Sequence, residues 1–416
     1  MPSAPPDGTP VPVDGHLDRA AVADLAGTPL GIYVHVPFCR TRCGYCDFNT
    51  YTAADLGPGA SRATYASQAI AEIEFARRVL GPGAPAVSTV FFGGGTPTLL
   101  PPADLAAILA AIDRQFGLAG DAEVTTEANP ESVDRRALAD LRAAGFTRIS
   151  LGMQSAAAHV LATLDRSHTP GRAERCVEWA RAAGFDHVSL DLIYGTPGET
   201  PADWEHSVRR AVAAGPDHVS AYALIVEDGT RLAARVRRGE LAPPDDDAMA
   251  DRYLAADDLL AAAGLTWYEV SNWALGPESA CRHNLLYWTG ANWWGIGPGA
   301  HSHVGGTRWW NVRHPAAYAA RIAAGHSPGQ ASEVLTDAER RIERIMLTTR
   351  LASGCPADDL SPAGLGGARA AVAAGLAEAG ALDAGRVVLT RRGRLLADAV
   401  IRDLTDSGPA APGTAS

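Results

Sequence analysis

Residues 141–151 read LRAAGFTRISL, and residues 180–190 repeat the phrase as ARAAGFDHVSL. Weaker echoes follow at residues 213–220 (AAGPDHVS) and 262–268 (AAGLTWY). Each phrase is typical of a helix end, a glycine in the left-handed cap position and then a short apolar strand. Their return at intervals of roughly 30–50 residues indicates the βα units of a parallel sheet.

The pattern around these phrases predicts six strands, one further strand at 267–270, and helices between them. The strands are expected at 32–36, 87–92, 123–127, 148–152, 187–193 and 219–224, and the helices include 62–79, 102–116, 133–144 and 201–214. Right-handed βα units in this number curl into a partial or complete (β/α) barrel of the TIM type, so the predicted fold class is α/β. An open doubly wound sheet is the alternative. We assign residues 29–275 to the barrel.

Polar, chemistry-bearing residues follow the predicted strands where βα loops begin. They are the cysteine run after the first strand, Gly93-Gly94-Gly95-Thr96-Pro97-Thr98 after the second, Glu127-Ala128-Asn129-Pro130 at the end of the third, Met153-Gln154 after the fourth and Asp191 near the end of the fifth. In either architecture the carboxyl ends of parallel strands meet at one rim. The sequence therefore predicts a polar site at this rim.

Three cysteines, Cys39, Cys43 and Cys46, lie in the run HVPFCRTRCGYCDF at residues 35–48. Thiolates are soft ligands that suit iron–sulfur clusters, and this spacing supplies three of them where a full protein set has four. A 4Fe–4S cluster held at three corners leaves one iron open to a small molecule. A zinc site completed by His35 is the alternative, and disulfides are disfavoured because nothing indicates a secreted chain.

Length and charge restrict the class of protein. The 416 residues carry a formal net charge of −11, which disfavours nonspecific binding to nucleic acid or anionic membranes. No uncharged apolar run is long enough to span a membrane. Residues 1–28, rich in Pro, Gly, Ala and Asp, lack the features of a secretion signal. We interpret them as a flexible tail on a cytoplasmic protein.

An aromatic-rich extension follows the barrel at residues 276–330. Seven of the nine tryptophans lie between Trp267 and Trp310, interleaved with His283 and His301. Aromatic side chains beside histidines suit a flat apolar ligand such as a porphyrin, with a histidine as axial ligand. The alternative is an aromatic subdomain interface, in which Trp and Tyr supply buried area.

The composition changes again after residue 330. Helical patterns at 339–350 and 368–379 precede a predicted short hairpin at 387–398, so residues 331–405 suggest a small, mostly helical, winged-helix-like module. Such modules often bind DNA, but the acidic charge and the missing basic recognition helix argue against it. Residues 406–416 are expected to be disordered.

These motifs together resemble a known superfamily. The run through Cys39, Cys43 and Cys46 resembles the cluster motif of radical S-adenosylmethionine proteins, and the segment 93–98 resembles their glycine motif. With the segments EANP (127–130), LGMQS (151–155) and DLIYG (191–195), the chain is similar to the oxygen-independent coproporphyrinogen III oxidase-like branch, and within it to HemW-type haem chaperones.

The resemblance implies a 4Fe–4S cluster on the three cysteines and S-adenosylmethionine on the fourth iron. Cofactor contacts are implied for Tyr33, Tyr45, Gly94, Gly95, Thr96 and Glu127. Gln154, Arg166 and Asp191 match positions that bind a second S-adenosylmethionine in the oxidases of this branch.

Two features distinguish chaperone from oxidase within the branch. Phe48 stands where the oxidases carry a fourth cysteine, and residues 283–288 (HNLLYW) match the haem-associated motif of the chaperones, with His283 as the expected haem contact. The resemblance therefore implies a chaperone that delivers haem to an acceptor protein such as a respiratory enzyme. Radical decarboxylation of coproporphyrinogen is the alternative, so the sequence leaves open whether the chain is an enzyme.

Overall fold

The computed structural model describes residues 8–25, 27–57, 59–166 and 168–405. The chain forms two compact units. The first contains the residues up to Thr266 together with Trp273–His283 and Ala291–Val334. The second contains Trp267–Asn272, Asn284–Gly290 and the chain from Leu335 onward.

Six parallel strands in sequence order form the centre of the first unit. They are β2 (Leu30–Val36), β3 (Val87–Gly94), β4 (Leu118–Ala128), β5 (Arg148–Gln154), β6 (His187–Tyr194) and β7 (His218–Ala223). Each strand pairs with the next in parallel register. A doubly wound sheet reverses its strand order at a switch point, whereas this order runs in one direction. The predicted barrel is therefore confirmed in its partial form.

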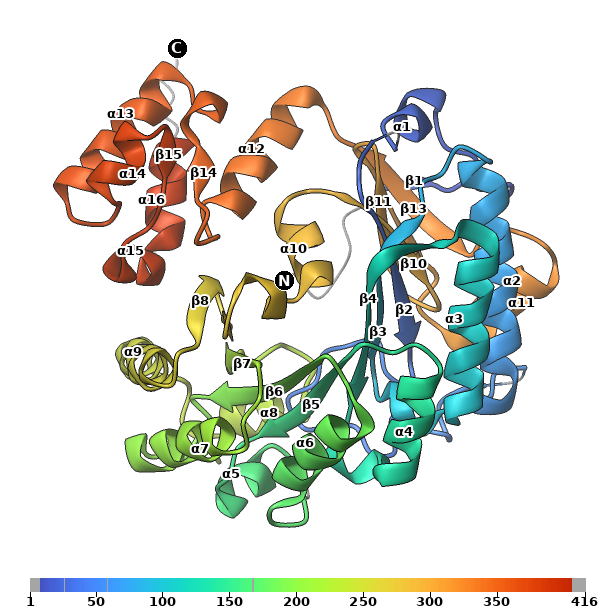
Figure 1. The fold of residues 1–416 in the computed structure, drawn as a ribbon, viewed down its shortest axis with the longest axis horizontal. Coiled ribbons are helices and arrows are strands. Elements are labelled where there is room, and N and C mark those ends of the chain that lie inside the picture. The colour runs from blue at the N-terminus through green and yellow to red at the C-terminus, as the bar shows by residue number, and fades with distance from the viewer. Residues whose placement is uncertain (1–7, 26, 58, 167, 406–416) are drawn as a thin grey trace. The chain divides into compact units, whose positions relative to one another are not determined.

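Helices alternate with these strands along the chain. They are α2 (Arg62–Leu80), α3 (Pro102–Phe116), α4 (Arg135–Ala143), α5 (Ala158–Thr163), α6 (Arg172–Ala183), α7 (Pro201–Ala213), α8 (Arg231–Arg237) and α9 (Asp246–Ala262). Of these, α2, α3, α4, α6 and α7 lie along the outside of the curved sheet (Figure 1). Short 3₁₀ turns, η1 (Pro97–Leu99) and η2 (Pro130–Ser132), follow β3 and β4.

The repeated sequence motif forms a helix end, a glycine cap and a strand, as predicted. Gly184 ends α6 in the left-handed conformation, with φ +85°, and the N–H of Phe185 donates to the carbonyl of Ala180. The N–H of Phe146 donates in the same way to the carbonyl of Leu141. Glycine reaches positive φ without a Cβ clash, so the chain turns directly from helix into strand.

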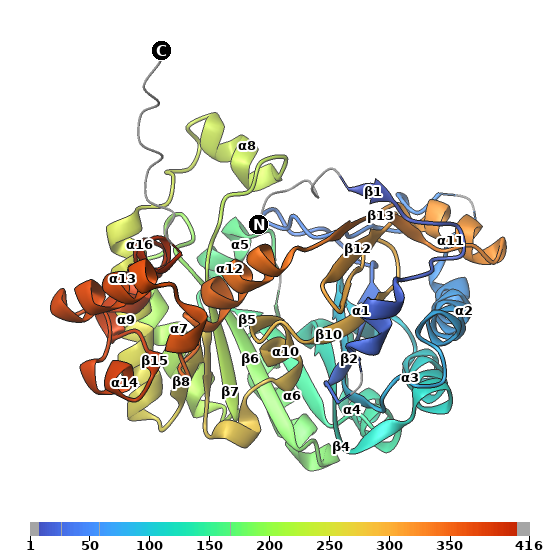
Figure 2. The ribbon, with the colours of Figure 1, turned by 90° about the horizontal axis from the view of Figure 1, so that it is seen from above.

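The two faces of the parallel strands differ in chemistry, because successive side chains of a strand point to opposite sides. One face is apolar and fully buried, for example at Ile32, Val34, Val90, Phe92, Ile149, Leu151, Val188 and Leu190. The other face carries buried polar groups at His35, Thr89, Thr125, Arg148, Ser189, His218 and Ser220. Figure 2 shows β5, β6 and β7 side by side from above. The inner face of the partial barrel therefore carries polar side chains that can bind polar ligands near the rim.

The sheet continues beyond β2 into the aromatic-rich extension. Its elements are β10 (Asn292–Ile296), β11 (His301–Val304), β12 (Thr307–Asn311), α11 (Pro315–Ala323) and β13 (Gly329–Val334). β10 pairs in parallel with β2, and β11, β12 and β13 follow in antiparallel order. On the other side of the sheet β9 (Asn272–Ala274) lies beyond β7.

The expected flexible tail is folded where the structure describes it. β1 (Thr9–Pro10) pairs with the edge strand β13, and α1 (Arg19–Ala23) follows. Leu25 is only 1% exposed. The expectation for residues 8–25 is therefore wrong, because a few apolar side chains and an open sheet edge fix a segment whose composition alone indicates a tail. Residues 1–7 and residue 26 of that expected tail lie outside the described residues.

The second unit is mostly helical, as predicted. Its main elements are α12 (Asp337–Thr348), β14 (Cys355–Pro356), α13 (Pro362–Ala373), α14 (Ala379–Asp383), β15 (Arg386–Val387), α15 (Arg391–Leu395) and α16 (Ala397–Leu404). Its core includes Ile345, Cys355, Val387 and Val400. β8 (Thr266–Glu269) and α10 (Arg282–Trp288) contain residues of both units.

The strands of the second unit pair differently from the prediction. β14 pairs with β15, so no hairpin forms at 387–398. Thr390 instead caps α15 by accepting the N–H of Gly393 at 3.0 Å, and the helical spacing of Val400, Ile401 and Leu404 buries one side of α16. Residues 406–416, predicted to be disordered, lie outside the described residues.

No helix among the described residues combines the length and apolarity that crossing a membrane requires.

Candidate functional site

The cysteine loop leaves the end of β2 and is closed at its base by backbone hydrogen bonds. The N–H of Cys39 donates to the carbonyl of Tyr51 at 3.0 Å, and the N–H of Tyr51 donates to Pro37 at 2.7 Å. Cys39, Cys43 and Cys46 are unpaired and only partly buried. The loop therefore presents three thiols from one short, fixed segment at the rim of the partial barrel.

A second attachment holds the middle of this loop. The N–H of Gly44 donates to the carbonyl of Leu164 at 3.2 Å, and its carbonyl accepts the N–H of Leu232 at 2.8 Å. A Cβ at Gly44 would collide with the carboxylate of Asp165. A side chain at position 44 would therefore force the Asp165 carboxylate to move.

Asn49 makes the third attachment, which sequence reasoning missed. Its Nδ2 donates to the carbonyls of Pro298 at 3.0 Å and Arg313 at 2.8 Å, and its Oδ1 accepts the hydroxyl of Tyr51 at 3.0 Å. The Nε2 of His35 lies 2.9 Å from the backbone oxygen of Asn49. An asparagine in a loop gives no signal by itself, since its partners lie about 250 residues away in sequence.

Glu72 supports the segment to which Asn49 is attached. This fully buried carboxylate on α2 accepts the N–H of Gly297 at 2.7 Å, the amide of Asn311 at 2.7 Å and the hydroxyl of Tyr318 at 2.6 Å. Burial raises its pKa to about 7, against the lowering effect of these three donors. One function of the extension is thus to hold the cysteine loop.

The electrostatics of the three thiols favour a positively charged occupant. Burial raises the pKa of Cys39 to about 11, helped by the nearby Cys46 and Cys43, and burial also raises the pKa of Cys46. Thiolates here would repel one another unless iron compensated their charge. Among the described residues no three His, Cys, Asp or Glu side chains converge on one point that could hold a single ion. Cluster thiolates bind separate iron atoms and need not converge, so the donor set fits a cluster.

The glycine segment lies directly against the cysteine loop. The N–H of Gly95 donates to the carbonyl of Val36, and the N–H of Thr96 donates to that of Phe38, both at 2.8 Å. A Cβ at Gly95 would lie 2.5 Å from the carbonyl oxygen of Phe38. Gly94 has φ +110°, and a Cβ there would meet the His35 ring at 2.7 Å. The two segments can approach this closely only without side chains.

Glu127 joins the glycine segment at the rim. Its Oε2 accepts the N–H of Gly94 at 3.1 Å. Burial raises its pKa to about 8, the nearby Asp191 adds to the effect, and the Gly94 N–H and Arg166 oppose it. A carboxylate in this position is suited to accept hydrogen bonds from an ammonium group or from sugar hydroxyls.

The remaining predicted rim residues lie close together. Gln154 has φ +64°, which is unusual for a residue with a side chain, and a Cβ on Gly152 would come within 2.8 Å of its Nε2 and 3.3 Å of an Arg166 nitrogen. Arg166 donates to the hydroxyl of Tyr45 at 3.4 Å. Asp191 accepts the hydroxyl of Ser150 at 2.9 Å. These contacts bring Gln154 and Arg166 close to Tyr45, and the charges of Asp191 and Arg166 act on Glu127.

His283 lies in the interior of the first unit, beside the predicted cofactor residue Tyr33. Its imidazole is 1% exposed, its Nδ1 lies 2.8 Å from the Thr89 hydroxyl, and its ring stacks on Phe91 and Tyr33 at 5.3 and 6.4 Å. Burial lowers its pKa to about 3. The backbone N–H of His283 donates to the carboxylate of Glu123 at 3.0 Å. That carboxylate also caps α10 by accepting the backbone N–H of Arg282. The ring is therefore tied into the core.

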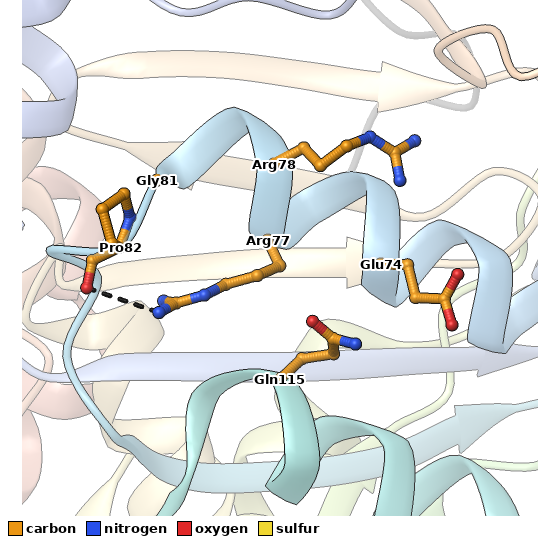
Figure 3. Close-up of a pocket in the computed structure, with 6 residues that line it drawn as sticks. All are labelled: Glu74, Arg77, Arg78, Gly81, Pro82 and Gln115. Atoms are coloured by element: carbon orange, nitrogen blue, oxygen red, sulfur yellow. Dashed lines mark hydrogen bonds between the residues drawn. The ribbon is translucent and has the colours of Figure 1, made fainter.

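A surface hollow of about 480 Å³ lies elsewhere (Figure 3). It is lined by Glu74, Arg77, Arg78, Gly81, Pro82 and Gln115, and Arg77 donates to the carbonyl of Pro82 at 3.3 Å. This end of α2 precedes β3 and so lies at the amino ends of the strands. The hollow shares no residue with the predicted site.

Comparison with known proteins gives one superfamily and one group within it. Residues 33–211 match the Radical SAM superfamily. A heme chaperone HemW of Mycobacterium tuberculosis (strain H37Rv) is 55% identical over 388 residues, covering 93% of this chain and 98% of the relative. HemW of Bacillus subtilis is 34% identical and covers 88% and 97%. Coproporphyrinogen III oxidase HemN of Escherichia coli superposes with a TM-score of 0.79 at 22% identity, covering 96% and 97%, which shows a shared fold.

Proposed function

The chain belongs to the HemW group of the radical S-adenosylmethionine superfamily, and from this premise we propose that it is a haem chaperone, which binds haem and passes it to an acceptor protein. The observation that carries the proposal is 55% identity over 98% of the length of a HemW protein. The acceptor is a haem-requiring protein, such as a respiratory enzyme, and the proposed location is the cytoplasm.

We propose that Cys39, Cys43 and Cys46 hold a 4Fe–4S cluster and that S-adenosylmethionine occupies the remaining iron. When bound and reduced, this pair supplies one-electron chemistry that amino-acid side chains lack. The three attachments of the cysteine loop support the assignment, because they fix the thiols before any ligand binds. The raised pKa of Cys39 means that loading releases protons, so metal uptake improves as pH rises.

The rim residues have separate proposed roles toward S-adenosylmethionine. Gly94, Gly95 and Thr96 let backbone groups approach the methionine part, and Glu127 accepts from its ammonium or from ribose hydroxyls. Tyr33 and Tyr45 border the cluster loop. Gln154, Arg166 and Asp191 would contact a second molecule, and their proximity to Glu127 supports a continuous polar surface for such ligands.

Decarboxylation of coproporphyrinogen is the competing function. Phe48 stands at the position where the oxidases of this branch have a fourth cysteine, and its side chain is 60% exposed and supplies no thiol. A haem contact at His283 remains a proposal based on the motif. It requires the imidazole to leave Thr89 and Phe91, which now enclose it.

Two measurements on one anaerobically reconstituted sample separate the functions. Haem titration followed by absorbance should saturate at one haem per chain. Incubation with S-adenosylmethionine, reductant and coproporphyrinogen should leave that substrate unchanged. Turnover to protoporphyrinogen would establish the oxidase, and haem absorbance that rises without saturation would remove the chaperone proposal.

A further inference from the structure

His35 lies near the carboxyl end of β2, between the cysteine loop and the glycine segment, and is only 6% exposed. An added Cβ at Gly94 would meet two atoms of its ring at 2.7 Å, so the ring packs directly on that glycine. The backbone oxygen of His35 accepts the hydroxyl of the buried Tyr65 at 2.6 Å. A Cβ at Gly297, in the extension, would come within 2.5 Å of the same oxygen. Both the ring and the backbone of His35 are therefore held by neighbouring segments.

Both ring nitrogens of His35 have partners within the protein. Nε2 lies 2.9 Å from the backbone oxygen of Asn49 in the cysteine loop. Nδ1 lies 3.1 Å from the hydroxyl of Tyr33, and the centroids of these two rings are 5.9 Å apart. Zinc would need one of the two nitrogens, and both are engaged. The arrangement therefore argues against a zinc site completed by His35.

The position of the proton on this ring follows from the chemistry of its partners. The backbone oxygen of Asn49 can accept a hydrogen bond but cannot donate one, so Nε2 must carry a proton. Burial lowers the pKa of His35 to about 4, although the hydrogen bond to Asn49 opposes this shift. The ring is thus neutral at neutral pH and has one ring N–H. Nδ1 is then an acceptor, and the hydroxyl of Tyr33 donates to it.

This direction of donation restricts what Tyr33 can do toward a ligand. Its ring borders the glycine segment, because a Cβ at Gly93 would come within 3.1 Å of the Tyr33 ring and 3.2 Å of a carboxylate oxygen of Glu127. Since the hydroxyl hydrogen of Tyr33 is directed to His35, its oxygen can meet a ligand only as an acceptor. With the opposite tautomer of His35, the same hydroxyl would accept from Nδ1 and donate to the ligand. One proton on His35 therefore decides which ligand groups Tyr33 recognises.

We propose that His35 is a positioning residue that acts through both ends of its imidazole. Through Nε2 it holds the cysteine loop at Asn49, and through Nδ1 it fixes the hydroxyl of Tyr33 as an acceptor for N–H or O–H groups of S-adenosylmethionine. The inference deepens the proposed function, because it rests on the proposed cluster and its ligand. It does not depend on haem binding.

The tautomer of His35 can be measured on the apo protein. Nitrogen NMR of protein with isotope-labelled histidine distinguishes protonated from unprotonated ring nitrogens, and the signals of His35 are those lost in His35→Gln. We expect a neutral ring with its proton on Nε2, without iron or S-adenosylmethionine present. A proton on Nδ1, or a ring that exchanges between the two tautomers, would overturn the proposal. This result is independent of whether the chain is a haem chaperone.

Two substitutions separate the two ends of the ring. The side-chain amide of Gln reaches the position of Nε2, so His35→Gln can still donate to Asn49 but offers no acceptor to Tyr33. The shorter amide of Asn reaches the position of Nδ1, so His35→Asn keeps that acceptor and loses the donor to Asn49. After anaerobic reconstitution, His35→Gln should keep the iron and sulfide of the wild type and bind S-adenosylmethionine about tenfold more weakly. His35→Asn should instead lose iron and sulfide on gel filtration.

A double variant tests whether His35 acts on the ligand through Tyr33. Tyr33→Phe should weaken binding of S-adenosylmethionine as much as His35→Gln does, and the double variant should be no weaker than either. His206→Ala, exposed on α7, is the control that should match the wild type, and circular dichroism reports the fold of each variant. Additive losses, or wild-type affinity in His35→Gln, would show that His35 does not position Tyr33. Wild-type protein that binds neither iron nor S-adenosylmethionine would instead refute the proposed cofactor site, whatever the tautomer.

Discussion

Gly95→Ala tests whether close backbone packing holds the cysteine loop. The added Cβ would lie 2.5, 2.9 and 3.0 Å from the carbonyl oxygen, carbonyl carbon and nitrogen of Phe38, where ordinary contacts are 3.4–4 Å. All three atoms are backbone, so the loop must retreat by roughly 1 Å, a form of overpacking that costs about 1–3 kcal/mol. The loss of glycine entropy in the unfolded chain offsets less than about 1 kcal/mol of this cost. We expect a net destabilisation of about 1–2 kcal/mol.

The displacement also matters for chemistry, because Phe38 immediately precedes Cys39. Urea unfolding of the apo protein measures the stability change, and iron and sulfide analysis after anaerobic reconstitution measures the effect on the cluster. Gly120→Ala on β4 is the matched control, since its Cβ meets no atom within 4 Å. Equal stability and equal iron content in the two variants would refute the packing argument.

Three further predictions concern single side chains. Asn49→Asp, which removes the donors to Pro298 and Arg313, should lower cluster retention on gel filtration, whereas Thr52→Ala should not. Burial raises the pKa of Glu72 from 4.5 to about 7, so the unfolded chain releases a proton that the folded chain keeps, and stability should fall by about 3 kcal/mol as pH rises through this window. Unfolding of Glu72→Gln should lack that slope; a parallel pH profile would contradict the assignment. Thr89→Val should destabilise the protein by about 1–2 kcal/mol through the lost partner of His283, and unchanged thermal unfolding would show that this contact is dispensable.

Much of the barrel could be predicted because its signals are local. The helix-cap glycines and the apolar strands that follow them recur in sequence, and the observed α3 (Pro102–Phe116) begins and ends at its predicted residues. The polar site at the rim could be predicted from one rule, which is that parallel strands bring their carboxyl ends together. Gly95 and Glu127 could therefore be placed at one site without knowledge of any distance.

The errors and omissions concern long-range partners. Val387-Val388-Leu389 has strand character, but the segment after it becomes helical because Val400 and Leu404 find a core to bury against. Thr9 becomes a strand residue only because the edge of β13 is available to pair with it. Asn49 could not be recognised, since its function depends on carbonyl groups contributed by the extension.

His283 shows the limit of motif matching. The motif predicts a haem contact at His283, which stays a prediction, and the sequence could not show that the carboxylate of Glu123 holds its backbone and Thr89 its ring.

Metal and sulfide analysis of anaerobically purified protein tests the central claim most directly. Three thiols without a fourth predict about four iron atoms and four acid-labile sulfides per chain. Cys43→Ser should lose both together, and wild-type protein should respond spectroscopically to S-adenosylmethionine. One zinc per chain, or iron without sulfide, would contradict a cluster on Cys39, Cys43 and Cys46.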